Sequence, residues 1–287
     1  MRRLLETALL QAFRGLVRVV PYARAQWMPR FLLAIARPVL AKPVLRALER
    51  VAAVYPDWSL AECRRVVLDS LLSLATTGVE WLYMDRHGAG FLEMVEVAEE
   101  GTEHLAALAD GGIIVGAHLG NWELSGALMG RRLAGRRLVV VGRRQGNSVL
   151  DAMAVRLRER LGMEHATRHW RDAPGLSRAL AEGGVLGLVA DQHASRGVQI
   201  IFLGRPALAF AGPALLARRH NLPIVATAVL REGWGRFREV VSPPIRVGGR
   251  TDDEVVQVYS SALEALVQRA PGQWMWLHGR WKGPKRG

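Results

Sequence analysis

The sequence predicts an α/β protein, with a mixed, largely parallel β-sheet covered by helices and an N-terminal helical region. From residue 101 onward, short continuous apolar runs alternate with segments of helical periodicity, a pattern typical of parallel strands buried on both faces. The first hundred residues show helical spacing instead. Hydrophobic residues make up 50% of the 287 positions, which is enough for one large domain or for a core domain with a helical annex.

The first 45 residues combine apolar helical stripes with cations. Pro21 ends the first stripe, and residues 31–43 repeat the pattern around Arg37 and Lys42. No uncharged apolar run approaches the roughly 18–20 residues that a membrane-spanning helix needs. An apolar stripe backed by cations is typical of a helix in a membrane interface, although a helix packed on its own domain shows the same pattern. We therefore expect residues 1–45 to form an amphipathic membrane-interface region and residues 46–287 an α/β domain. The first stripe comprises Leu5, Leu9, Phe13, Leu16 and Val20, opposite Arg14 and Arg18.

The remaining elements follow from caps and periodicity. Ser59 and Glu62 form a capping box that opens a helix reaching about Trp81, and residues 1–100 are expected to be helical throughout. Strands and helices then alternate. The expected strands are 113–117, 138–141, 185–190 and 199–203, with a strand pair at 224–230 and 237–241. The expected helices are 121–129, 147–161, 176–181, 212–220 and 252–269.

The charge balance points to polyanionic partners. The net charge is +13, which suits nucleic acid, an anionic membrane face or an acidic protein. No zinc finger, RNA-binding aromatic motif or basic-region heptad occurs, which weighs against nucleic acid. The single cysteine, Cys63, excludes an internal disulfide and fits a reducing compartment.

Residues 111–123 carry the best indication of chemistry. An apolar run ends in His118, and Glu123 follows five positions later across an expected turn. Ligands bind beyond the carboxyl ends of the strands in open α/β sheets. His118, Arg143 and Asp191 are each expected just past such an end, with Arg144 as an alternative to Arg143. An imidazole, a guanidinium and a carboxylate are therefore expected together at one edge of the sheet.

His118 and Glu123 suit a general base with its orienting partner. A carboxylate on one imidazole nitrogen fixes the tautomer and stabilises the imidazolium, while the other nitrogen takes a proton from a hydroxyl. Glu123 would lie in the first turn of the next helix, where the helix dipole favours a carboxylate. A structural histidine that happens to precede an acid is the alternative interpretation. Asp191 and His193 have no His or Cys cluster near them, so no metal is expected.

Several stretches together resemble the bacterial lipid A biosynthesis acyltransferases, within the group of glycerolipid-type acyltransferases that share an HxxxxD/E motif. His118 and Glu123 match that motif. The match spans roughly residues 45–282, and the ordered set is more specific than any one motif. The other matching stretches are Tyr55–Ser59, Arg143…Asn147…Leu150-Asp151, Ala190-Asp191-Gln192, Phe202–Pro206 with Gly212-Pro213, and Gln273–Lys282.

The resemblance implies transfer of a fatty acyl chain from an acyl thioester to a hydroxyl of a lipid A precursor or related glycolipid. His118 would deprotonate the acceptor hydroxyl and Glu123 would orient it. Arg143, Asn147, Asp191 and Gln192 would bind substrate, Asp191 by fixing Arg143 or the acceptor sugar. No cofactor is implied. The donor would be acidic acyl carrier protein, or coenzyme A in some branches. The enzyme would be peripheral or monotopic at the cytoplasmic face of the bacterial inner membrane.

Three departures from the family pattern leave the acceptor open. Arg50 stands where the family usually has Asn, His193 where Asp is common, and Gly279 where Arg is usual. The acceptor could then be a mannosylated phosphatidylinositol. Two other functions also stay open. One is a non-catalytic membrane-surface lipid-binding protein, and the other is a thioesterase in which His118 activates water. The sequence has no Gly-x-Ser-x-Gly elbow for a serine hydrolase.

Overall fold

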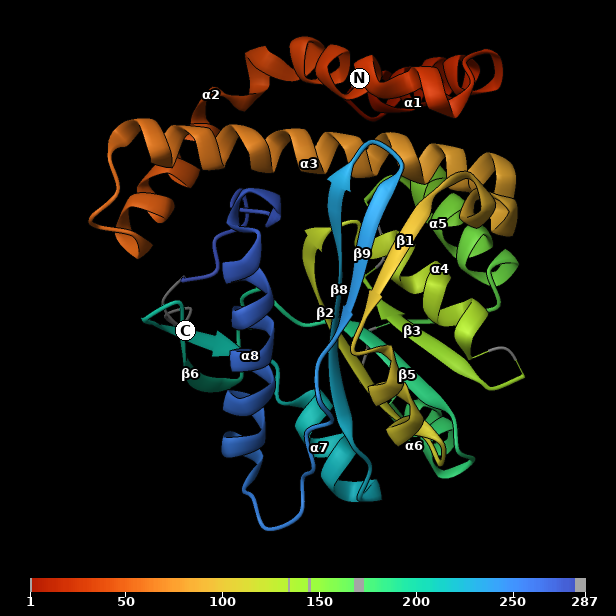
Figure 1. Cartoon of the computed structure of the whole chain (residues 1–287), viewed down its shortest axis with the longest axis vertical. Coiled ribbons are helices and arrows are strands. Elements are labelled where there is room, and N and C mark those ends of the chain that lie inside the picture. The colour runs from red at the N-terminus through yellow and green to blue at the C-terminus, as the bar shows by residue number, and fades with distance from the viewer. Residues whose placement is uncertain (1, 134, 144–145, 168–172, 282–287) are drawn as a thin grey trace.

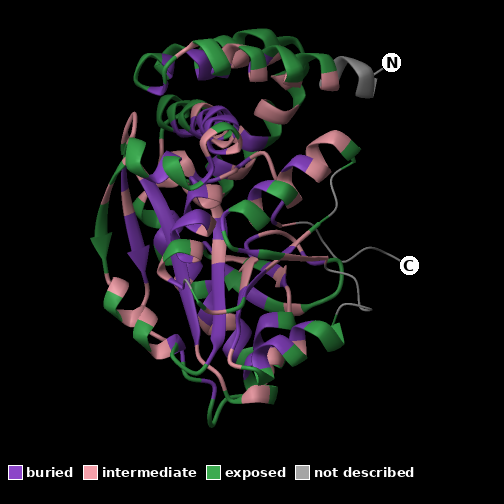
Figure 2. Cartoon of the chain, turned by 90° about the vertical axis from the view of Figure 1, so that its right-hand side faces the viewer, coloured by how far each residue is buried: buried purple, intermediate pink, exposed green. Residues whose placement is uncertain are grey.

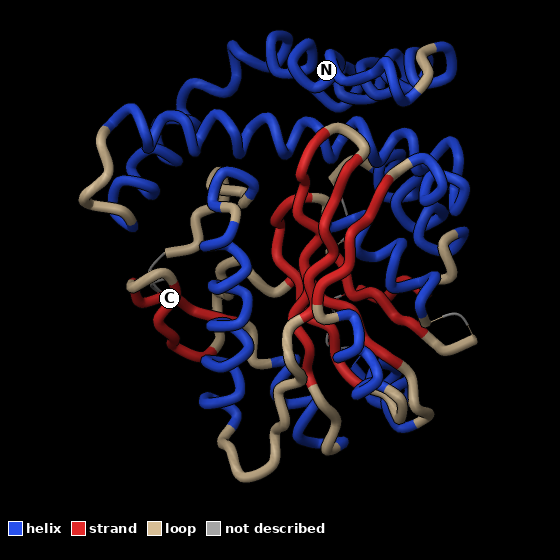
Figure 3. The backbone as a smooth tube through the Cα atoms, in the orientation of Figure 1, coloured by secondary structure: helices blue, strands red, loops and turns tan. Residues whose placement is uncertain are grey.

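A computed structural model describes residues 2–133, 135–143, 146–167 and 173–281, with the side chains of residues 2–6 excluded. Its centre is a seven-stranded sheet in the order β1-β9-β8-β2-β5-β3-β4, as Figures 1 and 3 show. Strands β8 and β9 are antiparallel, and the other neighbouring pairs are parallel. A separate hairpin joins β6 to β7. The mixed, largely parallel sheet expected from the sequence is confirmed. The strands are β1 Glu96–Glu100, β2 Gly112–Gly120, β3 Leu138–Gly142, β4 Glu164–Thr167, β5 Val185–Val189, β6 Val198–Phe202, β7 Arg205–Ala209, β8 Ile224–Gly233 and β9 Arg236–Val241.

Helices cover both faces of this sheet. On one face, α4 (Trp122–Arg132) and α5 (Ser148–Arg160) pack on Ile114, Val225 and other strand side chains. On the other face, Val115 and its neighbours face the remaining helices. The strands are therefore apolar on both faces, which explains their continuous apolar sequences. The helices of the second face are α6 Ala173–Ala181, α7 Gly212–His220 and α8 Asp252–Arg269.

A helical layer lies over one end of the sheet. It comprises α1 (Arg2–Val19), the short 3₁₀ helix η1 (Tyr22–Trp27), α2 (Met28–Val54) and α3 (Leu60–His87). Strands β2 and β8 end toward α3, and α1 and α2 lie beyond α3 (Figures 1 and 2). The expected capping box of Ser59 and Glu62 opens α3. The carboxyl ends of β2 and β8 therefore lie beneath the N-terminal helices.

The apolar stripe of α1 packs largely on the protein itself. Phe13 and Val17 are 6% and 1% exposed, and Leu16 and Val20 pack against the same core. Leu9 stays exposed, and the side chain of Leu5 lies outside the described residues. The interpretation of this stripe as a helix packed on its own domain therefore holds for Phe13, Leu16 and Val20. The boundary expected between residues 45 and 46 falls inside α2.

Three strands were missing from the expectation. β1 interrupts the region expected to be wholly helical, and its five residues are mostly exposed and acidic, without the alternation of a strand. β4 and β7 are short and have little apolar periodicity. In each case the segment is a strand because it pairs with a neighbouring strand, and the local sequence does not indicate that pairing.

Candidate active site

His118 lies within β2 near its end, two residues before Gly120. The strand continues past the expected end at residue 117, and its register with β8 shifts between Gly116 and Gly120. Gly120 has φ of 58°, and a Cβ there would approach the carbonyl oxygen of Val229 to 2.0 Å. Only glycine fits this position. The chain then turns, and the Asn121 side chain accepts from the backbone N–H of Leu124 to cap α4.

The partner of the imidazole is Asp191, directly beyond β5. His118 Nδ1 lies 2.8 Å from Asp191 Oδ1, and the backbone N–H of His118 donates to Oδ2 at 2.9 Å. Asp191 is 3% exposed. Burial alone would raise the pKa of its carboxyl group, but the His118 charge and the hydrogen bonds outweigh burial and hold that pKa below its usual value. The ionised carboxylate accepts Nδ1–H, which leaves Nε2 as the basic nitrogen.

The structure pairs Glu123 with an arginine, and the orienting role expected of it at His118 stays a prediction. Glu123 lies in the first turn of α4 as predicted, but its Oε1 atom pairs with the Arg158 guanidinium of α5 at 3.2 Å. The start of α4 carries the Glu123 side chain away from Nδ1, while the parallel pairing of β2 with β5 brings Asp191 to that atom. Asp191, and not Glu123, is therefore the carboxylate that contacts Nδ1, while the expected binding of substrate by Asp191 stays a prediction.

The C-terminal segment completes the cluster. The indole N–H of Trp274 donates to Asp191 Oδ2 at 2.8 Å, and the backbone N–H of Met275 donates to the carbonyl oxygen of His118 at 3.0 Å. Arg280 is 1% exposed and donates to the carbonyl oxygen of Gln192 at 2.9 Å. Trp274 is buried in the core, but its N–H also fixes Asp191, and only its place in the Gln273–Lys282 motif could have indicated this.

The other expected substrate-binding residues lie at the same edge. Gln192 Nε2 is 3.5 Å from His118 Nε2. Asn147 caps α5 and donates to Thr7 Oγ1 of α1 at 3.2 Å. Arg143 is exposed and directly follows β3. Arg144 and Lys282 lie outside the described residues. The structure thus brings Gln192 to the imidazole and places Arg143 and Asn147 around the turn between β3 and α5.

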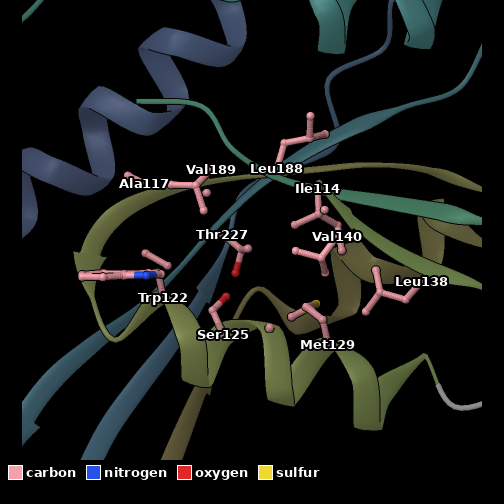
Figure 4. A pocket seen from close by; sticks show the side chains of 14 residues that line it. Ile114, Ala117, Trp122, Ser125, Met129, Leu138, Val140, Leu188, Val189 and Thr227 are labelled. Atoms are coloured by element: carbon pink, nitrogen blue, oxygen red, sulfur yellow. The ribbon is translucent and has the colours of Figure 1, made fainter. Parts of the chain in front are cut away.

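A narrow apolar pocket opens beside the imidazole, between α4 and the sheet. The Trp122 ring lies 5.1 Å from the His118 ring and also lines the pocket. Figure 4 shows strand side chains such as Ile114 and Val140 facing Ser125 and Met129 of α4. Gly116 and Gly187 keep the sheet side of the pocket open because they have no side chains. Its lining suits an unbranched hydrocarbon chain.

Two absences hold for the part of the chain that the structure describes. No group of three or more His, Cys, Asp or Glu side chains there could hold a metal ion. No helix within the described ranges has the length and apolar character needed to cross a bilayer.

An imidazole fixed by a buried carboxylate, next to a narrow apolar pocket, is the arrangement of a group-transfer enzyme with an apolar substrate. Comparison with known families identifies the family of enzymes to which the chain belongs. Residues 2–283 match the model of the bacterial lipid A biosynthesis acyltransferases, and the chain belongs to this family. It is an O-acyltransferase, as the resemblance implied.

Characterised relatives cover most of the chain. The lipid A biosynthesis lauroyltransferase of Escherichia coli K12 is 26% identical over 263 residues, covering 85% of this chain and 83% of the relative. The palmitoleoyltransferase of the same strain is 23% identical over 261 residues, covering 87% and 82%. The phosphatidylinositol mannoside acyltransferase of Mycobacterium tuberculosis H37Rv is 28% identical over 190 residues, covering 63% and 58%. The solved structure of the acyltransferase PlsC from Thermotoga maritima matches with a TM-score of 0.41 and 12% identity, covering 80% of this chain and 96% of that one.

Proposed function

We propose that this enzyme transfers a fatty acyl chain from an acyl thioester to a hydroxyl group of a lipid A precursor or a related glycolipid. The geometry of His118 and Asp191 carries the proposal, because it holds a basic imidazole against Trp122, which lines an apolar pocket. The lauroyl- and palmitoleoyltransferase relatives favour lipid A as the acceptor class. The shorter match to the mannoside acyltransferase keeps a mannosylated phosphatidylinositol as the alternative.

His118 acts as the general base. Nε2 takes the proton of the acceptor hydroxyl as its oxygen attacks the thioester carbonyl carbon. The new C–O bond forms, the tetrahedral intermediate collapses, the C–S bond breaks, and the imidazolium returns its proton to the leaving thiolate. Asp191 stabilises the imidazolium throughout. General-base assistance of this kind contributes roughly 10²–10⁴ in rate.

The pocket between α4 and the sheet holds the acyl chain. Trp122 links the two parts of the site, since it contacts the imidazole and lines the pocket. Arg143, Asn147 and Gln192 bind the acceptor at the same edge. Glu123 positions Arg158 at the start of α4. No cofactor takes part.

The donor and the membrane both suit the basic surface. An acyl carrier protein is strongly acidic, and the chain carries a net charge of +13. Trp27, Phe31, Ile35 and Val39 recur every four residues along η1 and α2, and each is more than 40% exposed. Seven cations and no acid lie between Thr7 and Leu48. This row and its flanking cations seat the enzyme on the anionic cytoplasmic face of the inner membrane, as a peripheral or monotopic protein.

Lipid mass spectrometry tests the proposal. A deletion strain of the source organism should lack one acyl chain on a glycolipid. The wild-type gene should restore it, and a His118→Ala gene should not. The lost mass names the acceptor and the chain. An assay of free thiol from purified enzyme distinguishes the alternatives. A thioesterase releases thiol without acceptor, and a lipid-binding protein releases none with or without it.

A further inference from the structure

A single hydroxyl group interrupts the apolar sheet face inside the pocket. Thr227 of β8 is 3% exposed, and its Oγ1 atom has no hydrogen-bond partner within the described ranges. Val225 and Val229, two positions away on either side, belong to the apolar core of the same face. A buried hydroxyl without a partner costs free energy, so a bound group is expected to supply the missing bond.

A second hydroxyl faces the first. Ser125 of α4 is 8% exposed and lines the same pocket, and Figure 4 shows its hydroxyl turned toward that of Thr227 across the gap. Thr227 pairs with Gly116 of β2, which has no side chain to fill this space. The other strand and helix side chains around the two hydroxyls are apolar or aromatic, among them Ile114, Val140 and Met129.

The register gives the depth of this pair in the pocket. Gly116 precedes His118 by two residues, a distance of roughly 7 Å along a strand. An acyl thioester whose carbonyl group lies at His118 would therefore bring one of the first several carbons of its chain between Ser125 and Thr227. A hydroxyl on such a carbon can donate to one residue and accept from the other.

We infer that the pocket selects a hydroxyacyl chain, with the chain hydroxyl bound between Thr227 and Ser125. The inference rests on the proposed function for the reaction, but chain binding can be measured without turnover. A plain chain leaves the two buried hydroxyls unpaired, and a site built to hydrogen-bond a hydroxyl discriminates against the analogue that lacks it.

Direct binding provides the test. The affinities of 3-hydroxymyristic, 6-hydroxymyristic and myristic acids are compared by calorimetry for the wild type, Thr227→Val and Ser125→Ala. The wild type should bind one hydroxy acid roughly three- to tenfold more tightly than myristic acid, as one net hydrogen bond allows. Thr227→Val should lose this preference and keep its affinity for myristic acid. Thr76→Val is the matched control, because the Thr76 hydroxyl bonds to Leu72 within α3, away from the pocket.

Two results would overturn the inference. One is equal wild-type affinity for all three acids. If Thr227→Val is then also more stable to heat than the wild type, the Thr227 hydroxyl binds an ordered water only. The other is a preference that survives in both Thr227→Val and Ser125→Ala. His118→Ala is measured in parallel and should keep the preference. Absence of acyl transfer by the wild type, together with intact hydroxy-acid selectivity, would contradict the proposed reaction and leave this inference standing.

Discussion

The indole N–H of Trp274 donates to Asp191 Oδ2 at 2.8 Å, on the same oxygen that accepts the backbone N–H of His118. Two segments far apart in the sequence thereby hold one carboxylate against the imidazole. Since the other carboxylate oxygen accepts from Nδ1, both oxygens of Asp191 have fixed positions. The C-terminal segment is therefore part of the hydrogen-bond network around His118 and Asp191.

Trp274→Phe should lower kcat roughly tenfold, because it removes one hydrogen bond to a charged group and keeps the ring. KM for both substrates should change little, since Trp274 does not line the pocket. Trp276→Phe is the control. Its indole N–H donates to the carbonyl oxygen of Pro271, so its loss leaves Asp191 unchanged. Steady-state kinetics of both variants make the comparison, and equal kcat values for Trp274→Phe and wild type would contradict the role of the N–H.

Asp191→Asn and Glu123→Gln should differ in activity. The amide at 191 cannot stabilise the imidazolium, so kcat should fall roughly 10²–10⁴-fold. Glu123→Gln loses the ion pair with Arg158 but leaves the imidazole contacts intact, so its loss should be at least tenfold smaller. Thiol-release kinetics with donor and acceptor present provide the measurement. If Glu123→Gln were the more damaging change, Glu123 would be the orienting group during turnover.

Gly187→Ala should shift the acyl-chain preference toward shorter chains. A Cβ at Gly187 would contact Val140 at 3.5 Å, an ordinary packing distance, so the added methyl group fits and narrows the pocket. The relative kcat/KM across a series of acyl thioesters measures the effect. Gly78→Ala on α3, where a Cβ meets nothing within 4 Å, should leave the preference unchanged. If the relative kcat/KM values of Gly187→Ala across this series equal those of the wild type, the acyl chain binds outside this pocket.

The combined substitution of Ile35→Asp and Val39→Asp should weaken vesicle binding at least tenfold. It exchanges apolar contact with the bilayer for two charges that anionic lipids repel. Sedimentation with phosphatidylglycerol-containing vesicles measures it. Leu215→Asp is the control, because Leu215 is 50% exposed on α7, a helix that Figure 1 shows at the opposite end of the molecule from α2. Undiminished binding of the double variant would show that another surface meets the membrane.

Acid should remove the stabilising contribution of Asp191. The folded-state pKa of this carboxyl group lies below its ordinary value of 3.8. Its contribution to the free energy of unfolding is therefore complete above that ordinary value and is lost as the pH falls through the lower folded pKa. The difference in unfolding free energy between wild type and Asp191→Asn should shrink as the pH falls below this ordinary value. Urea denaturation at a series of pH values measures it, and a difference that grows in acid has the wrong sign.

Local patterns predicted most of the fold and the place of His118 near the end of a buried strand. Apolar runs and capping residues depend on neighbours in the sequence, so the capping box of α3 and the helix start at Asn147 were predicted correctly. The glycines around His118 and the apolar run before it likewise marked a strand ending at a site. β1 was missed because its acidic residues form a strand only through pairing with β9.

The sequence by itself determined an α/β acyltransferase with His118 at the carboxyl edge of its sheet, because strand periodicity and motif order are local. Only the tertiary structure decided what His118 contacts. Asp191 lies 73 residues further along the chain and reaches Nδ1 because β5 pairs with β2, with Val189 opposite Gly116. Glu123 is nearer in sequence, but the start of α4 directs it to Arg158. Distance along a chain does not measure distance across a sheet, and pairing between strands set the partner of the imidazole.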